Sequence, residues 1–156
     1  MSARALMLES FQGEVDPAAA AERTLRLRVE RAALRLSETA VQALLPPGTP
    51  LELQRLRPGV ASFRHSLGTV EARPVISPSG ALLIEVTGVR AAGILPVPLP
   101  FVHAAIRQAL PTRPGLRLGP GGNPEIELRE LLGPLGVELP PLRSAQALDG
   151  ELRLEW

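Results

Sequence analysis

Cysteine and lysine are both missing from this chain of 156 residues. Without cysteine there is no disulfide, no thiolate nucleophile and no thiolate ligand for a metal. Because all 17 basic residues are arginine, the chain also has no Schiff-base lysine, phosphate-loop lysine or lysine general base. Several large classes of enzyme are therefore excluded.

Aromatic residues are scarce, at 3% of the chain, with no tyrosine, three phenylalanines and one tryptophan. Hydrophobic residues still make up 45% of the sequence, so we expect a core built from Leu, Val, Ile and Ala. Few side chains remain on which a base or a sugar can stack. The 17 basic and 16 acidic residues are interleaved, which argues against a nucleic-acid partner because such proteins carry a basic stripe.

Long apolar runs are absent as well. The N-terminal residues Met1–Glu9 lack the apolar run of a signal peptide, because Glu9 interrupts it. No segment reaches the roughly 20 apolar residues that cross a bilayer. The sequence therefore predicts a cytoplasmic protein without a transmembrane segment, in which contact with a membrane is at most peripheral.

The pattern of the N-terminal half predicts a helical extension over residues 1–23, followed by one α+β domain over residues 24–156. A short helix is expected over Ala3–Phe11, and Asp16 before Pro17 is typical of a second helix start. Alternating Leu and Val then predict a strand over Thr24–Glu30. Ser37 is expected to cap a helix over Glu38–Leu45, with Leu36 packed on Val41 as a hydrophobic staple.

The rest of the chain predicts an antiparallel meander and one more long helix. Residues 51–89 alternate like strands, with turns at Pro58-Gly59, at Leu67-Gly68 and over Ser77–Gly80. A helix is expected over Phe101–Leu110. The fold class predicted is α+β, in which a curved, twisted antiparallel sheet packs on two main helices.

Three shorter features follow the second helix. Residues 111–124 are rich in proline and glycine and predict a mobile surface loop. A strand over Glu125–Leu128 and a helical turn over Arg129–Leu135 come next. The last element expected is a hairpin over Leu142–Trp156, because Asp149-Gly150 between alternating apolar residues is a strong signal for a two-residue turn.

No group of residues carries a catalytic or metal-binding signature. His65 and His103 do not have the spacing of metal ligands, and the Gly-x-Ser-x-Gly motif of serine hydrolases is absent. The densest acidic group is Glu125, Glu127 and Glu130, for which a solvated strand face is the favoured interpretation. An enzyme would need a cleft in which one of these acids, or His65, met another titratable group.

Four arginines fall within the meander, at positions 55, 57, 64 and 73. Their planar guanidinium groups suit phosphate head groups, so one alternative is an anion site. The favoured interpretation is that most are exposed strand residues paired with neighbouring glutamates.

The apolar face of the second helix is the remaining candidate site. Its side chains either complete an ordinary core or line a groove that admits an acyl chain, in which each buried methylene contributes about 0.8 kcal/mol. The candidate ligand-binding residues are Val97, Leu99, Phe101, Val102, Ile106 and Leu110.

Three stretches carry a resemblance to a known family: residues 36–45, the strand Leu82–Val89 leading to Leu99–Leu110, and Leu131–Gly136 with Leu142–Leu154. In this order of elements the chain resembles the LmeA-like phospholipid-binding proteins of bacteria, the family of the mycobacterial activator of lipomannan elongation, distantly related to the tubular lipid-binding (TULIP) proteins. The resemblance implies a curved antiparallel sheet that packs on helices and shelters lipid. The chain differs from typical members in lacking an export signal.

These observations favour a non-enzymatic domain that binds a phospholipid, a fatty acid or another amphipathic ligand in an apolar groove between sheet and helices. The alternative is a structural or protein-interaction module that acts through an apolar patch or a sheet edge, with a homodimer as one form. Neither hypothesis requires a cofactor or a metal.

Overall fold

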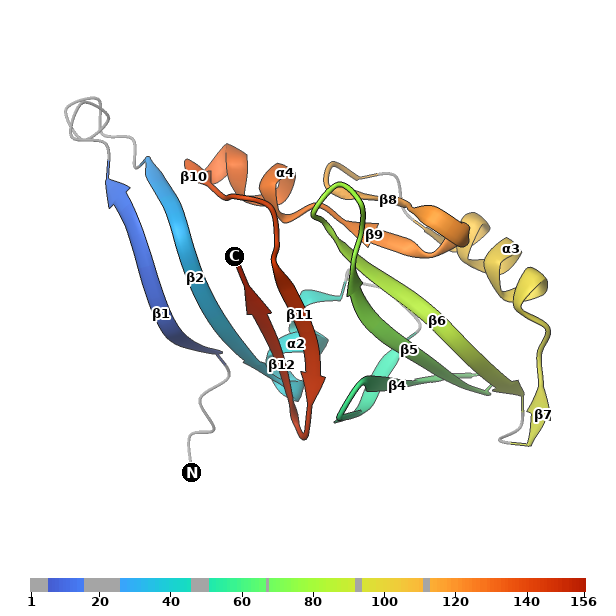
Figure 1. Cartoon of the computed structure of the whole chain (residues 1–156). Helices are drawn as coiled ribbons and strands as arrows, with labels where there is room; N and C mark the ends of the chain where they lie inside the picture. The colour runs from blue at the N-terminus through green and yellow to red at the C-terminus, as the bar shows by residue number, and fades with distance from the viewer. Residues whose placement is uncertain (1–5, 16–25, 46–50, 67, 92–93, 111–112) are drawn as a thin grey trace.

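The computed structural model describes residues 6–15, 26–45, 51–66, 68–91, 94–110 and 113–156. Strands dominate these residues and helices are few, which confirms the α+β class (Figure 1). The described strands are divided between two sheets, where the sequence predicts one. Antiparallel pairing prevails in both sheets, and the parallel pair that β10 makes with β2 is an exception.

The five-stranded sheet combines the two ends of the chain. Its order is β1-β2-β12-β11, and β10 pairs with β2 beside this path. The strands are β1 (Leu6–Val15), β2 (Leu27–Ser37), β10 (Val137–Glu138), β11 (Ser144–Leu148) and β12 (Glu151–Glu155).

The seven-stranded sheet is the predicted meander with later strands added at one side. Its order is β3-β4-β5-β6-β9-β8, and β7 pairs with the end of β6. The strands are β3 (Glu52–Arg57), β4 (Val60–His65), β5 (Gly68–Ile76), β6 (Leu82–Ala91), β7 (Leu95–Pro96), β8 (Leu116–Leu118) and β9 (Pro124–Ile126).

The two longer described helices lie where the sequence predicts them. The bounds are α2 (Glu38–Leu44), α3 (Leu99–Ala109) and α4 (Leu128–Leu132), with short 3-10 turns η1 (Pro120–Gly122) and η2 (Gly133–Leu135). The hydroxyl of Ser37 caps α2 by accepting from the amide of Ala40 at 3.2 Å. Val41 packs against the core cluster that contains Leu36.

The core lies between the two sheets and is aliphatic apart from one phenylalanine and one tryptophan. The sheets meet along β11: the amide of Gly59 donates to Ala147 O at 2.9 Å, and that of Gly150 to Leu56 O at 3.0 Å. The buried apolar cluster comprises Val29, Ala32, Leu36, Leu56, Ala61, Phe63, Ala72, Leu82, Leu142, Ala147, Leu152, Leu154 and Trp156.

The helix predicted over Ala3–Phe11 is wrong for its described part, since residues 6–15 form β1. Good helix formers such as Leu, Met and Glu are present there. An isolated stretch of this length gains little helical stability on its own, whereas β1 pairs with β2 along its whole length. The helix start predicted at Asp16-Pro17 lies outside the described residues.

Strand β2 continues well past the predicted end at Glu30. The pairing shifts register between Gln12 and Gly13, and this irregularity breaks the alternation of β2. Farther along, Ala32 and Ala33 are both buried. Strict period-two alternation therefore ends while the strand itself goes on.

The mobile loop predicted over residues 111–124 is also wrong in its described part. Here the chain forms β8, η1 and β9, and the buried side chain of Asn123 holds them together. Its Oδ1 accepts from the amide of Val86 on β6 at 3.0 Å, and its Nδ2 donates to Pro120 O at 3.2 Å. Gly121 and Gly122 have φ of 73° and 77°, so the glycines serve an ordered turn.

The strand predicted over Glu125–Leu128 is confirmed only at Glu125 and Ile126, whereas the helical turn predicted over Arg129–Leu135 is present as α4 and η2. Strand β9 ends at Ile126, and the Glu127 carboxylate then caps α4 by accepting from the amide of Arg129 at 3.1 Å. The predicted turns at Ser77–Gly80 and Asp149-Gly150 are both present. Gly80 and Gly150 have φ of 80° and 72°, which β-carbon-bearing residues rarely adopt.

Candidate functional site

The six candidate ligand-binding residues do not share one face of α3. Val102, Ile106 and Leu110 are half-buried, whereas Phe101 is 70% exposed. The most exposed positions near the start of α3 include Phe101, Ala104 and Ala105, at the spacing of one helix face. The inward face of α3 packs against η1 and β6.

Val97 and Leu99 line a cavity between the start of α3 and the strands β5, β6 and β7. Its volume is about 310 Å³, at the lower end of the range of small-molecule sites. The other four candidate residues do not line it. The lining residues are Thr69, Glu71, Thr87, Gly88, Val89, Arg90, Pro96, Val97 and Leu99.

Gly88 keeps part of this cavity open. A β-carbon built at this position would meet no atom within 4 Å, and the backbone there is not left-handed. The pairing of β5 with β6 shifts register beside it, between Glu71 and Ala72. A larger side chain at position 88 could therefore fill the space over Gly88 without strain.

The polar groups of the cavity leave one positive charge available. The Thr87 hydroxyl donates to the backbone oxygen of Glu71 at 3.2 Å, and the Glu71 carboxylate lies 3.6 Å from Arg57. Arg90 is exposed and has no ion-pair partner among the acids of the described residues. Together with the apolar walls of Val89 and Val97, Arg90 makes the cavity suited to an amphipathic anion.

The acidic group of the sequence forms a buried ionic network. Glu125 and Glu127 are each only 4% exposed, so the prediction of a solvated strand face is wrong for both. Arg117 donates to Glu125 Oε1 from Nη2 at 2.7 Å and to Glu130 Oε1 from Nη1 at 3.0 Å. Arg129 makes two 2.8 Å hydrogen bonds to the two oxygens of Glu127.

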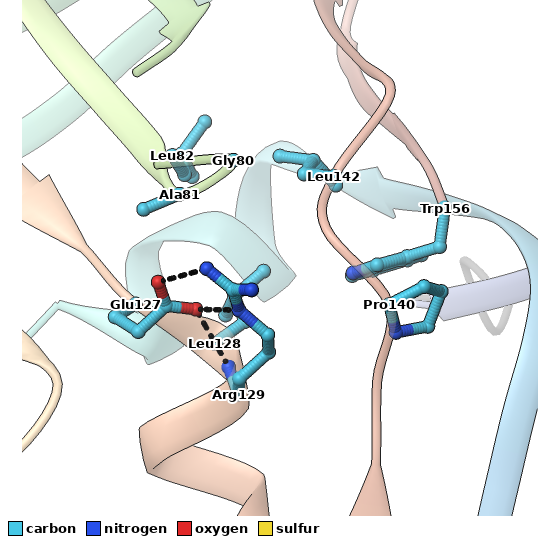
Figure 2. A pocket seen from close by; sticks show the side chains of 9 residues that line it. All are labelled: Gly80, Ala81, Leu82, Glu127, Leu128, Arg129, Pro140, Leu142 and Trp156. Atoms are coloured by element: carbon cyan, nitrogen blue, oxygen red, sulfur yellow. Dashed lines mark hydrogen bonds and ion pairs between the residues drawn. The ribbon is translucent and has the colours of Figure 1, made fainter. Parts of the chain in front are cut away.

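The network ties α4 to the turn between β5 and β6. Arg129 also donates to the backbone oxygen of Ser79 at 2.6 Å. Figure 2 shows the Glu127–Arg129 pair beneath Gly80, Ala81 and Leu82, with Trp156 on the opposite side. The space between these side chains is too small for a water molecule.

Hydrogen bonding dominates the electrostatics of the pair. The hydrogen bonds from Arg129 hold the pKa of Glu127 below its ordinary value, and burial opposes this shift only in part. The bond to Glu127 in turn raises the pKa of Arg129, and the bond to Glu125 raises that of Arg117. Both arginines stay cationic and Glu127 stays anionic at neutral pH, so this pair has no proton to exchange there.

The two histidines lie on different elements, His65 on β4 and His103 on α3. His103 packs against η1, where a β-carbon on Gly122 would lie 3.2 Å from its Cβ. No cluster of three or more His, Asp or Glu side chains in the described ranges is placed to hold a metal ion.

The meander arginines behave as the favoured interpretation predicts. Arg57, Arg64 and Arg73 pair with glutamates of other strands of the same sheet at 3.6, 3.5 and 2.7 Å. Arg55 pairs instead with Asp149 at 3.8 Å. Exposed pairs of this kind contribute little to stability, so they carry no functional argument.

Of the cavity residues, sequence patterns singled out only Val97 and Leu99, and they missed Gly88 and Arg90 among others. Both belong to a signal visible in the sequence: no Asp or Glu occurs from residue 86 to residue 124, although that stretch holds four arginines. A cation without an acid nearby in sequence is a candidate for binding an anion from outside.

Comparisons with protein-family models, with curated proteins and with solved structures find no match to this chain. Among the described helices, none has the length and apolar character needed to cross a bilayer. The resemblance to the LmeA-like family therefore stays a prediction from the sequence pattern.

Proposed function

We propose that this protein binds an amphipathic anion of the fatty-acid type in the cavity at the start of α3, without chemical conversion of the ligand. The observation that carries this proposal is the cavity of about 310 Å³ with apolar walls and Arg90 at its lining. An acyl chain would contact Val89, Val97 and Leu99, and the carboxylate would pair with the guanidinium of Arg90.

The volume of the site supports a single acyl chain as the ligand over a whole phospholipid. The cavity lies at the lower end of the volumes found for small-molecule sites. Each methylene that enters contributes about 0.8 kcal/mol, or about four-fold in affinity, until the cavity is full.

We propose that the ligand is not chemically converted, because the acidic side chains are paired with arginines. The acids most concentrated in the sequence are paired with Arg117 and Arg129, and Glu125 and Glu127 are each only 4% exposed. In the cavity itself, Glu71 is paired with Arg57. These arrangements favour binding over acid–base catalysis.

The experiment that tests this proposal fills the cavity from within. Gly88→Leu places a side chain where no atom now lies within 4 Å of the added β-carbon, so the variant is expected to fold. Ala104→Leu, on the exposed face of α3, is the matched control. The affinity for fatty acid is measured by displacement of a fluorescent analogue. It should fall at least ten-fold for Gly88→Leu and stay unchanged for Ala104→Leu. Equal binding by both variants would contradict the proposal.

A second candidate function has its own observation, the open outer edge of β1. Leu8, Phe11 and Val15 lie opposite the inward residues Leu34, Ala32 and Leu27 of β2, yet all three are exposed. An edge strand with exposed apolar residues is a template for a partner strand. A mass that rises with concentration in light scattering, and that Phe11→Glu returns to the monomer, would favour this interaction module.

A further inference from the structure

Three large apolar side chains are exposed around β7 and the first turn of α3. Ile94, Leu95 and Phe101 are 80%, 64% and 70% exposed, and we call them the apolar tip. The chain from Ile94 to Phe101 can span at most about 25 Å when fully extended, so the three belong to one region of the surface. Figure 1 shows β7 and the start of α3 at the end of the molecule opposite β1.

The apolar tip lies in a stretch without negative charge. Residues 86–124, which we call the acid-free segment, contain four arginines and no Asp or Glu, in a chain whose net charge is only +1. Arg117 is engaged by Glu125 and Glu130. Arg107 and Arg113 are exposed and have no ion-pair partner among the acids of the part of the chain that the structure describes.

We propose that the apolar tip docks on an anionic membrane surface, with Ile94, Leu95 and Phe101 entering the headgroup layer and Arg107 of α3 contacting lipid phosphates. Exposed apolar side chains in a segment whose only charged residues are arginines have the chemistry that such a surface recognises. The inference goes beyond ligand binding in the cavity, because the docking residues are not needed to hold a ligand there.

The molecule has two exposed apolar surfaces, and their charges indicate that the apolar tip is the one that fits an anionic membrane. Exposed apolar residues also occur on β1, but that strand has no arginine of its own and carries Glu14, which an anionic surface would repel, whereas its Glu9 is paired with Arg35 and Arg153. The acid-free segment carries no such charge. The two surfaces therefore differ in the partner they fit, although both expose large apolar side chains.

The apolar part of the proposal is tested by co-sedimentation with vesicles of phosphatidylglycerol mixed with phosphatidylcholine, and with vesicles of phosphatidylcholine alone. The wild-type chain should bind the mixed vesicles at least ten-fold more tightly than vesicles of phosphatidylcholine alone. Leu95→Asp and Phe101→Asp should each abolish this binding. Leu135→Asp is the matched control, because Leu135 is 69% exposed outside the acid-free segment, and it should bind like the wild type.

The charged part is tested with two arginine variants. An arginine near an anionic surface contributes about 1 kcal/mol, so Arg107→Gln should weaken binding by about five-fold. Arg31→Gln removes the same charge from an exposed position outside the acid-free segment and should change binding by less than about two-fold. Raising the salt concentration should weaken wild-type binding.

The result separates this inference from the ligand proposal. Gly88→Leu should bind mixed vesicles like the wild type, whatever happens to its fatty-acid binding. Equal binding to both vesicle types, or full binding by Leu95→Asp and Phe101→Asp, would overturn the inference. So would failure to bind vesicles together with a self-association that Leu95→Asp abolishes, since the apolar tip would then be a protein interface.

Discussion

At the scale of single residues, Arg90 sets the specificity that we propose for the cavity. The guanidinium should distinguish a carboxylate from a neutral head group on the same chain. We expect Arg90→Gln to weaken binding of a medium-chain fatty acid by about five-fold, since an exposed ion pair contributes about 1 kcal/mol. Binding of the matching alcohol should not change. Isothermal titration of both ligands checks this, and an equal loss for both would mean that Arg90 acts through packing alone.

The charge of Glu127 is expected to stabilise the fold. Glu127→Gln removes the charged partner of Arg129 at a buried position, so we expect a loss of about 1–3 kcal/mol in the free energy of unfolding. Glu52→Gln, in an exposed pair with Arg64, should cost less than about 0.5 kcal/mol. Urea unfolding of the two variants measures the difference. Equal losses would show that burial of Glu127 has no energetic consequence.

The same residue links stability to pH. The pKa of Glu127 is held below its ordinary value of 4.5 by the bonds from Arg129. A lowered pKa contributes stability in full above the ordinary value, and this contribution is lost as pH falls through the folded-state pKa. Unfolding free energies measured down a pH series should therefore fall below about pH 4.5, and fall less steeply in Glu127→Gln. A variant with the wild-type slope would refute this role.

At the scale of elements, Asn123 fastens the segment β8–η1–β9 to β6. Asn123→Ala leaves the buried amide of Val86 without its acceptor, for which we expect a cost of about 1–3 kcal/mol. Hydrogen exchange at Val86 should become faster than at Leu82, which keeps its pairing with β9. Gln146→Ala, at an exposed strand position, should change neither quantity. Unchanged exchange at Val86 would contradict this function of Asn123.

Local chemistry explains which elements the sequence predicts well. The Ser37 cap of α2, the Asp149-Gly150 hairpin and the Ser77–Gly80 turn each depend on a few adjacent residues with specific backbone or hydrogen-bonding preferences. The helix α3 follows from its spacing of apolar residues. These features were predictable because the interactions that define them lie within a few positions of one another.

Features that depend on distant partners were not predictable from one sequence. Strand β1 has helix-forming residues and becomes a strand because β2 pairs with it. Glu125 and Glu127 alternate like solvated strand residues, and it is Arg117 and Arg129 that bury them. Likewise, Val97 and Leu99 line the cavity only because β5 and β6 supply its opposite wall.

At the scale of the whole molecule, two surfaces of different chemistry lie at opposite ends. The five-stranded sheet ends at β1, an edge with apolar residues and glutamates, whereas β7 and α3, beside the seven-stranded sheet, contain no Asp or Glu. The cavity lies beside this second end, since β7 and the start of α3 form part of its lining. A ligand that leaves a membrane at the apolar tip would therefore have a short path to Val97 and Leu99.

The most direct test of the cavity proposal is a titration of the wild-type chain with a medium-chain fatty acid, followed by the backbone amide resonances in solution NMR. The proposal predicts saturable shifts at Gly88, Val89, Arg90 and Leu99, with no shift along β1 or β12. Shifts confined to β1, or no saturable shift at any residue, would contradict it.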